Sequence, residues 1–554
     1  MADRPKATND TARLLLGAMA VALFAFMLRY IGMSHEPKWD ELYHILAARS
    51  WAENGTFAIA DGEYTRARLF TVLVGIVTGW SDGSLDAIRL FCITIGTLLV
   101  VAVFLTVHAL VGRAEAWVVA IILSLLPGAI YLSQFIRFYS LHALLFWIAS
   151  IGVYFLLTRQ ARPLARASVA LLAGAAFVVA AHLQKTTLIG LVAVAAGGLA
   201  LGIPRLTGWF RSLDGRGRVA AIAAALTLAG MGLLLLAGPL SHLVDSYRSA
   251  SLWSRETNAA YYVVRYNSIF GTLWALFPLA VLHAASVNWR PAVFAATIFI
   301  VAFLLHSFAG MRSERYLFYA TPYFLLVWGI SLAAAFGQLI RLVEGWLRPW
   351  LAAVGTQRTA RQLSRVTVAL IAAWLLLMTP ATEHTARMLL DRPGSLSRYW
   401  FNFTSSWEKG VDSIRPMVED ADVFLTSQGH HALYYVGDFD VEISATGLSD
   451  FQNSNGGSDI DPRHGRRTIA ASGPLRRIVY CNPSGVIVVD ERNWRNAIGV
   501  NDDVADFIER HLEYVAIPAE ANMRVYRWSA ADAKLERQRL EWRDEGLTCG
   551  KGPA

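Results

Sequence analysis

The chain has 554 residues, of which 55% are hydrophobic and only 17% are charged. Soluble domains carry about 25% charged residues, so the composition excludes an ordinary soluble protein and indicates an α-helical polytopic membrane protein. The net charge of +8 would suit a nucleic-acid-binding protein. Most arginines, however, fall at the edges of apolar runs, where the positive-inside bias accounts for them, and we expect no nucleic acid partner.

Long apolar runs dominate the first two thirds of the chain. A helix needs about 17–25 apolar residues to cross a bilayer core, and the sequence holds about eleven such runs. They lie near residues 12–32, 87–111, 114–133, 140–158, 166–183, 186–203, 219–239, 267–286, 291–309, 317–337 and 366–381. No small-residue cleavage site follows the first run, which we therefore interpret as a retained transmembrane helix. The run Leu69–Trp80 is too short to cross and is expected to lie against the membrane surface.

The arginines predict the orientation of the spans. With the N-terminus inside, three cytoplasmic loops collect them: Arg159, Arg162 and Arg166; Arg205, Arg211, Arg216 and Arg218; and Arg341, Arg348, Arg358, Arg361 and Arg365. This agreement across separate loops is the pattern of the positive-inside rule. An odd number of spans then places the residues after about 382 outside. We expect a multi-pass protein of the inner (plasma) membrane with an extracytoplasmic (periplasmic) C-terminal domain.

The composition becomes that of a soluble domain from about His384 onward. Short buried strands are predicted at Val423–Thr426, Val441–Ser444, Val486–Val489 and Met523–Trp528, a helix at Asp503–Leu512, and a loop at 447–465. Alternating strands and helices indicate a small α/β domain. The predicted domains are therefore 1–383, a transmembrane module whose first extracytoplasmic loop is 33–86, and 384–554.

The three cysteines, Cys92, Cys481 and Cys549, have no spacing typical of a metal site. Cys481 and Cys549 would pair if the C-terminal domain lies in an oxidising compartment.

The first extracytoplasmic loop opens on Trp39-Asp40-Glu41. Two adjacent carboxylates directly after a membrane exit, at the start of a stretch with helical spacing, are candidates for acid–base chemistry. The alternative is an ordinary helix N-terminus, where acidic residues favour the helix dipole. Trp39 and Tyr43, four residues apart, are either ligand contacts or interfacial aromatic residues.

The predicted topology places cations from several loops on the same outer face. They and their aromatic neighbours are Arg66, Arg68, Arg137, Tyr139, His182, Lys185, Arg312, Arg315 and Tyr316. Each has a plainer interpretation, because basic side chains near span ends often snorkel to the lipid headgroups. His182 would otherwise serve as an interhelical hydrogen bonder, and Arg312 and Arg315 as topology anchors. Convergence of separate loops on one face nevertheless favours a binding site.

The order of these motifs resembles that of the GT-C type glycosyltransferases, in the branch of lipid A aminoarabinose transferases and protein O-mannosyltransferases. Trp39-Asp40-Glu41 is similar to the acidic motif of that family. Ser133–Leu141 is similar to its loop arginine motif, and Arg315-Tyr316-Leu317 with Pro322 to its late Arg-Tyr motif. The chain departs from the pattern at Thr65-Arg66-Ala67-Arg68, where many relatives have Lys-Pro-Pro, which leaves the phosphate contacts of the first loop open.

The resemblance implies transfer of a sugar from a polyprenyl-phosphate carrier to the hydroxyl of a lipid, glycan or protein acceptor, with inversion at the anomeric carbon. It implies Asp40 as the base, with Glu41 orienting the acceptor, the sugar or Asp40. Arg137, Lys185, Arg312 and Arg315 are candidates to stabilise the leaving phosphate, with Arg66 or Arg68 as alternatives, because arginine suits phosphate geometry.

No cofactor is expected. A Mg²⁺ or Mn²⁺ ion held by the acid pair and the phosphate is an alternative, but the cations make it unnecessary. The competing function is a transporter or lipid flippase with a cation-lined outer site. Transporters often carry inverted repeats and polar residues at mid-span, whereas these spans are mostly clean apolar runs with polar groups at one side.

Overall fold

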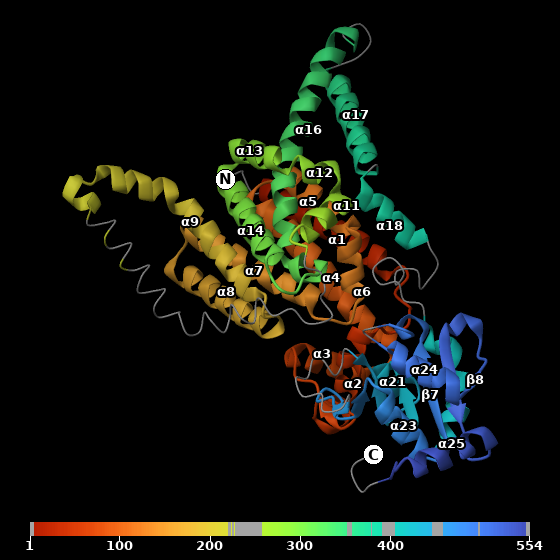
Figure 1. Cartoon of the computed structure of the whole chain (residues 1–554). Coiled ribbons are helices and arrows are strands. Elements are labelled where there is room, and N and C mark those ends of the chain that lie inside the picture. The colour runs from red at the N-terminus through yellow and green to blue at the C-terminus, as the bar shows by residue number, and fades with distance from the viewer. Residues whose placement is uncertain are drawn as a thin grey trace. The chain divides into compact units, whose positions relative to one another are not determined.

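The computed structural model describes residues 5–219, 223, 227, 258–351, 357–377, 379–390, 405–445, 458–496 and 499–549 (Figure 1). The chain divides into two compact units. The first comprises Met1–Met33, Arg89–Ala250 and Ser254–Arg392, and the second comprises Ser34–Ile88, Ser251–Trp253 and Pro393–Ala554. The residues predicted to form the first extracytoplasmic loop thus group with the C-terminal residues, and the predicted domain boundary at 383/384 stays a prediction.

The described part of the first unit is helical. Its elements are α1 (Pro5–Tyr30), α4 (Leu85–Leu110, whose first turn belongs to the second unit), α5 (Arg113–Leu125), α6 (Pro127–Gln134), α7 (Tyr139–Thr158), α8 (Pro163–Leu183), α9 (Thr187–Ser212), α11 (Tyr261–Phe270), α12 (Thr272–Ala275), α13 (Phe277–Val287), α14 (Trp289–Ser307), α15 (Glu314–Leu317), η1 (Phe318–Ala320), α16 (Thr321–Leu351), α17 (Gln357–Leu377) and α18 (Pro380–Leu390).

Among the described residues, 7 helices are long and apolar enough to cross a membrane, or 8 if the bent pair α5 and α6 forms one span. These candidates coincide with the predicted spans at 12–32, 87–111, 114–133, 140–158, 166–183, 186–203, 291–309 and 317–337. The polytopic α-helical fold is confirmed. Most of the predicted span 219–239 lies outside the described residues.

Two expected spans differ from the structure. The run 267–286 is divided among α11, α12 and α13, because Gly271 ends α11 with a φ of 50° and a proline lies in the first turn of α13. The run 366–381 is divided between α17 and α18, and Pro380 begins the second of these. Proline lacks the N–H that would continue a helix, so apolar composition alone overestimated the continuity of both runs.

The second unit contains a seven-stranded sheet in the order β5-β6-β4-β3-β7-β9-β8. The strands are β3 (Phe424–Thr426), β4 (Val441–Ile443), β5 (Ser458–Ile460), β6 (Arg467–Ile469), β7 (Gly485–Asp490), β8 (Glu513–Val515) and β9 (Met523–Trp528). Strands β6, β4, β3 and β7 are parallel, and the outer strands pair antiparallel. The predicted α/β domain and its strands are confirmed. Strand β5 falls in the expected loop 447–465, of which 447–457 lies outside the described residues.

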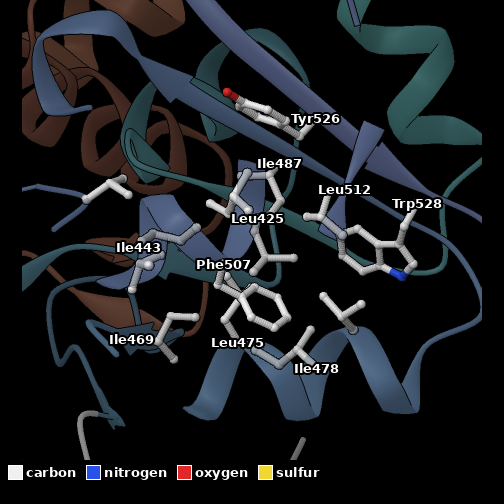
Figure 2. Packing of buried hydrophobic residues seen from close by; sticks show 14 of the residues in the cluster. Leu425, Ile443, Ile469, Leu475, Ile478, Ile487, Phe507, Leu512, Tyr526 and Trp528 are labelled. Atoms are coloured by element: carbon white, nitrogen blue, oxygen red, sulfur yellow. The ribbon is translucent and has the colours of Figure 1, made fainter. Parts of the chain in front are cut away.

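The sheet carries a hydrophobic core on each face. Along β7, Ile487 and Val489 belong to one cluster and Val486 and Val488 to the other, because successive side chains point to opposite faces. Helices α23 (Ser472–Cys481), α24 (Asp502–His511) and α25 (Ala533–Asp544) complete the first cluster, shown in Figure 2. Helices α20 (Trp407–Glu419) and α21 (Gly429–Tyr435) complete the second.

A disulfide joins Cys481 at the end of α23 to Cys549. The conditional pairing of the sequence analysis is thus present in the structure.

The loop segment of the second unit forms α2 (Trp39–Asn54), a hairpin of β1 (Ala58–Ile59) and β2 (Gly62–Glu63), and α3 (Arg68–Trp80). Helix α2 packs on α3, where a Cβ added to Gly75 would lie 2.4 Å from the Trp51 ring, and His44 Nδ1 is 2.9 Å from Thr71 Oγ1. The predicted short run Leu69–Trp80 is therefore a helix of 13 residues. Its place at the membrane surface stays a prediction.

Candidate functional site

The acidic pair lies in the first turn of α2, and its two members differ in environment. Glu41 is fully buried, and its Oε2 accepts a hydrogen bond from the Lys38 backbone N–H at 2.8 Å, which caps the helix. Asp40 is half-buried. The helix N-terminus favours a negative charge on Asp40. Glu41 thus has a structural role in the fold, and its expected orienting role stays a prediction.

Aromatic rings surround the side chains next to Asp40. The Tyr43 ring stacks on Tyr64 with centroids 4.9 Å apart, and it lies 4.1 Å from the His430 ring of α21. The Trp39 ring lies 4.7 Å from the same histidine. Burial raises the pKa of the Tyr43 phenol. Burial also lowers the pKa of His430, an effect that the nearby Asp40 charge opposes.

The two arginines of the first loop lie on its surface. Arg68 begins α3, and its Nη2 is 3.0 Å from Glu63 Oε1 in the preceding hairpin. Arg66 is exposed. The sequence analysis offered the two as alternative ligands of the lipid phosphate. Neither assignment is tested, and both stay predictions.

Two motifs that are far apart in the sequence meet in the first unit. The Arg137 guanidinium carbon lies 6.0 Å from the centre of the Tyr139 ring, and that of Arg315 lies 5.7 Å from the same ring. Tyr316 completes the group, with its ring centroid 6.4 Å from that of Tyr139. We call Arg137, Tyr139, Arg315 and Tyr316 the arginine–tyrosine cluster. It joins the SQFIRFYSL and RYL motifs.

The turn that carries Arg137 is held by α1. Arg29 Nε donates to Ser133 Oγ at 3.0 Å, and Gln134 Nε2 donates to the Arg29 and Ile31 carbonyls at 2.7 and 2.9 Å. Arg137 itself is only 4% exposed. The turn before Arg137 is therefore held by hydrogen bonds to α1 and the residue after it, more than 100 residues earlier in the sequence.

The remaining predicted cations are placed differently. Arg312 Nε donates to the Ser307 carbonyl at 2.9 Å, which holds it beside the end of α14. His182 and Lys185 are exposed at the end of α8. Within the described part of the chain, neither forms a hydrogen bond, ion pair or ring contact with the arginine–tyrosine cluster. Their roles stay predictions.

Further polar groups, not predicted from the sequence, lie on α7, α9, α14 and η1. His142 Nε2 lies 2.8 Å from Thr187 Oγ1, and its ring is 5.2 Å from that of Tyr319. His306 Nε2 lies 3.3 Å from the Tyr319 hydroxyl. The usable signal was the spacing of Tyr139 and His142, and of Tyr316 and Tyr319, each three residues apart and so on one helical face.

One further missed group is an ion pair. Arg265 on α11 pairs with Glu314, the residue before Arg315. This pair joins α11 to the segment that carries the late Arg-Tyr motif.

Glu442, Asp461 and His464 of the α/β domain have donor atoms within 4.8 Å of one another, close enough to hold a metal ion. The hydrogen bonds favour an ion-pair network instead. His464 Nδ1 accepts from the Arg466 backbone N–H at 3.1 Å, so the ring proton lies on Nε2, 2.8 Å from Glu442 Oε2. A metal-bound histidine normally donates its other N–H, which this arrangement prevents.

Arg463 completes the network through Asp461, with its Nε 2.9 Å from Oδ1. Although burial alone would lower the pKa of Arg463, its hydrogen bonds to Asp461 and the nearby charges raise it.

Comparison with solved structures identifies the fold. The structure is similar to ArnT of Cupriavidus metallidurans in the apo state, with a TM-score of 0.58 and 15% identity over 94% of this chain and 99% of that one. The same protein bound to undecaprenyl phosphate gives 0.55 and 14%, over 94% and 98%. The oligosaccharyltransferase AglB of Archaeoglobus fulgidus, in complex with an inhibitory peptide and a dolichol-phosphate, gives 0.53 and 12%, over 76% and 64%.

No protein-family model matches the chain, and no curated protein matches it in sequence. The structural neighbours are a lipid A aminoarabinose transferase and an oligosaccharyltransferase. The chain therefore has the fold of the GT-C glycosyltransferases, as its motifs predicted.

Proposed function

We propose that the chain is a membrane glycosyltransferase that moves a sugar from a polyprenyl-phosphate donor to an acceptor hydroxyl. The single observation that carries the proposal is the convergence of Arg137 and Arg315 on one tyrosine ring. It is supported by the fold, which is shared with one protein bound to undecaprenyl phosphate and another bound to dolichol-phosphate.

The arginine–tyrosine cluster is proposed to bind the lipid phosphate. The phosphate gains negative charge as its bond to the sugar breaks, and guanidinium groups fixed in advance stabilise such charge without reorganising. Arginine also offers paired N–H donors that match phosphate oxygens. Tyr139 would keep the two guanidinium groups in register, because a cation over a ring face is held there electrostatically.

Asp40 is proposed to act as the base. The acceptor oxygen forms a bond to the anomeric carbon while the bond from that carbon to the lipid phosphate breaks. The hydroxyl proton passes to an Asp40 carboxylate oxygen, and the displacement inverts the anomeric carbon. The helix N-terminus favours negative charge on Asp40, which suits a general base. The chemistry requires no metal.

The location of the chemistry is proposed to be extracytoplasmic. The disulfide between Cys481 and Cys549 supports this side for the α/β domain, because disulfides persist in oxidising compartments. The arginine-rich loops support a cytoplasmic N-terminus. The proposed setting is the inner membrane, with the α/β domain in the periplasm.

The experiment uses undecaprenyl phosphate as the probe, because the proposed reaction releases a polyprenyl phosphate. Arg137→Ala in the full chain should weaken its binding by roughly 10- to 100-fold, since a hydrogen bond to a charged group is worth about 1.5–3 kcal/mol. Arg166→Ala, near the start of α8, is the matched control and should bind as the wild type does. Unchanged affinity in Arg137→Ala would remove the cluster from the donor site.

A further inference from the structure

The chain entering α2 is attached to the α/β domain of the same unit. The Glu36 carboxylate accepts a hydrogen bond from the Trp407 backbone N–H at 3.0 Å and another from the Ser406 hydroxyl. The Pro37 carbonyl accepts a hydrogen bond from the His431 ring. The residues directly before the acidic pair are thus held by α20 and α21.

The first turns of α2 rest on the same helix, α21. The Trp39 ring contacts the rings of His430 and His431, with centroids 4.7 and 5.9 Å apart. The Tyr43 ring lies 4.1 Å from that of His430. Asp40 lies between Trp39 and Tyr43 in the sequence. The two histidines therefore contact α2 through residues on both sides of Asp40.

The end of α2 is also attached to the domain. Arg49 lies over the Tyr434 ring at 4.5 Å. In the hairpin that follows, the Asp61 N–H donates to the His464 carbonyl at 3.0 Å. A Cβ added to Gly62 would lie 2.5 Å from the His464 nitrogen, so the two backbones approach as closely as glycine permits.

Helix α21 follows β3, next to the point where the order of the strands in the sheet reverses. Strands β4 and β6 lie on one side of β3 and β7 lies on the other, so the chain reverses its winding between β3 and β7. Open α/β sheets bind ligands at the carboxyl ends of the strands, at such a reversal. In this chain, the segment leaving β3 there carries His430 and His431, and they contact α2.

Buried hydrogen bonds link the strands at this edge of the sheet. Gln428 Nε2 donates to Asp490 Oδ2 at 2.6 Å, which links the ends of β3 and β7, and Trp407 Nε1 donates to Gln428 Oε1 at 2.5 Å. His430 is fully buried, and its ring nitrogens have no hydrogen-bond partner among the described residues. Its contacts with α2 are therefore those of a packed aromatic ring.

We propose that the α/β domain is the platform that positions Asp40, and that His430 and His431 are positioning residues that act through Asp40. This inference rests on the proposed function, in which Asp40 is the base. It assigns residues 405–549 a role in catalysis that does not require the domain to touch either substrate.

The test compares His430→Ala with His430→Phe in the full chain. The lipid extract of a deletion strain supplies the native donor, and mass spectrometry follows the product. His430→Ala should lower turnover roughly 10- to 100-fold, because a misplacement of about 1 Å can cost about 100-fold. His430→Phe keeps a ring against Trp39 and Tyr43 and should restore most of the activity. Affinity for undecaprenyl phosphate should stay unchanged in both.

His511→Ala is the matched control, because His511 also packs between aromatic rings of the same domain, at 4.7 and 5.6 Å from Phe507 and Trp542. A general loss of domain stability would affect both alanine variants alike. In the Asp40→Asn background, His430→Ala should cause no additional loss, since it acts through Asp40. An additional loss of the same size would overturn the proposal.

A second readout does not depend on the proposed function. Amide hydrogens in the first turns of α2 should exchange faster in His430→Ala, and in His431→Ala, than in His511→Ala. An unchanged exchange rate would overturn the positioning role, whatever the activity shows. Full activity of Asp40→Asn together with faster exchange would instead reject the proposed base and keep the platform.

Discussion

Two arginines of the first unit pack against an aromatic ring, whereas two arginines of the second unit pair with carboxylates. In the first unit, Arg137 and Arg315 lie over the ring of Tyr139. In the second, Arg463 contacts Asp461 and Arg68 contacts Glu63. Aromatic packing thus gathers two arginines from distant motifs in the first unit, where we propose that they bind the lipid phosphate, whereas carboxylates of the second unit hold its own segments together.

We expect the largest loss of activity from substitution of Asp40 in α2. Asp40→Asn should reduce transfer by about 10²- to 10⁴-fold, the usual contribution of a positioned general base, with undecaprenyl phosphate binding retained. Glu41→Gln is the control, because glutamine can also cap the helix, and it should lose far less. A fully active Asp40→Asn would exclude Asp40 as the base. Retained lipid flux without any glycosyl transfer by the wild type would favour a transporter.

The next effect tests the structural charges of the second unit. Asp461→Asn leaves Arg463 without the carboxylate to which it is bound, and breaking such a buried pair costs about 3 kcal/mol of unfolding free energy. Thermal or denaturant unfolding followed on the α/β domain measures it. Glu513→Gln breaks an exposed pair with Arg527 and should cost less than about 1 kcal/mol. Equal losses would mean that the buried network has no special role.

A smaller effect concerns pH. Burial raises the pKa of Glu36 above its ordinary value of 4.5. The folded state therefore holds this proton more tightly than the unfolded state. The contribution of Glu36 to stability is fully present below pH 4.5 and declines as the pH rises through the folded-state pKa. Glu36→Gln should remove this part of the pH dependence in unfolding measurements from pH 4 to 8. The same dependence of stability on pH in Glu36→Gln and in the wild type would contradict this prediction.

The smallest expected effect is that of metal removal. Transfer should survive EDTA, because fixed guanidinium groups supply the positive charge at the phosphate. A loss of activity that Mn²⁺ restores would show instead that an acidic group holds a metal. The metal content of Asp40→Asn and Glu442→Gln would then show whether the metal is held at the start of α2 or by Glu442, Asp461 and His464.

Much of the α/β domain could be predicted because its central strands are buried on both faces. Such strands are short runs of apolar residues, as at Val486–Val489. Strand β5, with the sequence Ser-Asp-Ile, has no such run and pairs only at an edge of the sheet. Strand β5 is recognised by its pairing with β6, and no local sequence pattern predicted it.

The candidate site was predictable in one unit and less so in the other. The meeting of Arg137 with Arg315 was expected because the predicted topology placed both on one outer face, and the resemblance between motifs agreed with it. No pattern in the sequence predicted that His430 and His431 contact α2. Ring contacts between distant segments depend on the tertiary fold, and a His-His pair after a strand is equally compatible with a packed core.

The most direct measurement is mass spectrometry of the lipids extracted from a deletion strain. The extract is combined with membranes that contain the acceptor and is analysed before and after the purified protein is added. We expect a carrier-linked sugar to accumulate in the deletion strain. The wild-type protein should convert it to polyprenyl phosphate and a glycosylated product, and Asp40→Asn should leave it intact. A carrier-linked pool that is unchanged by deletion and untouched by the wild-type protein would contradict glycosyl transfer.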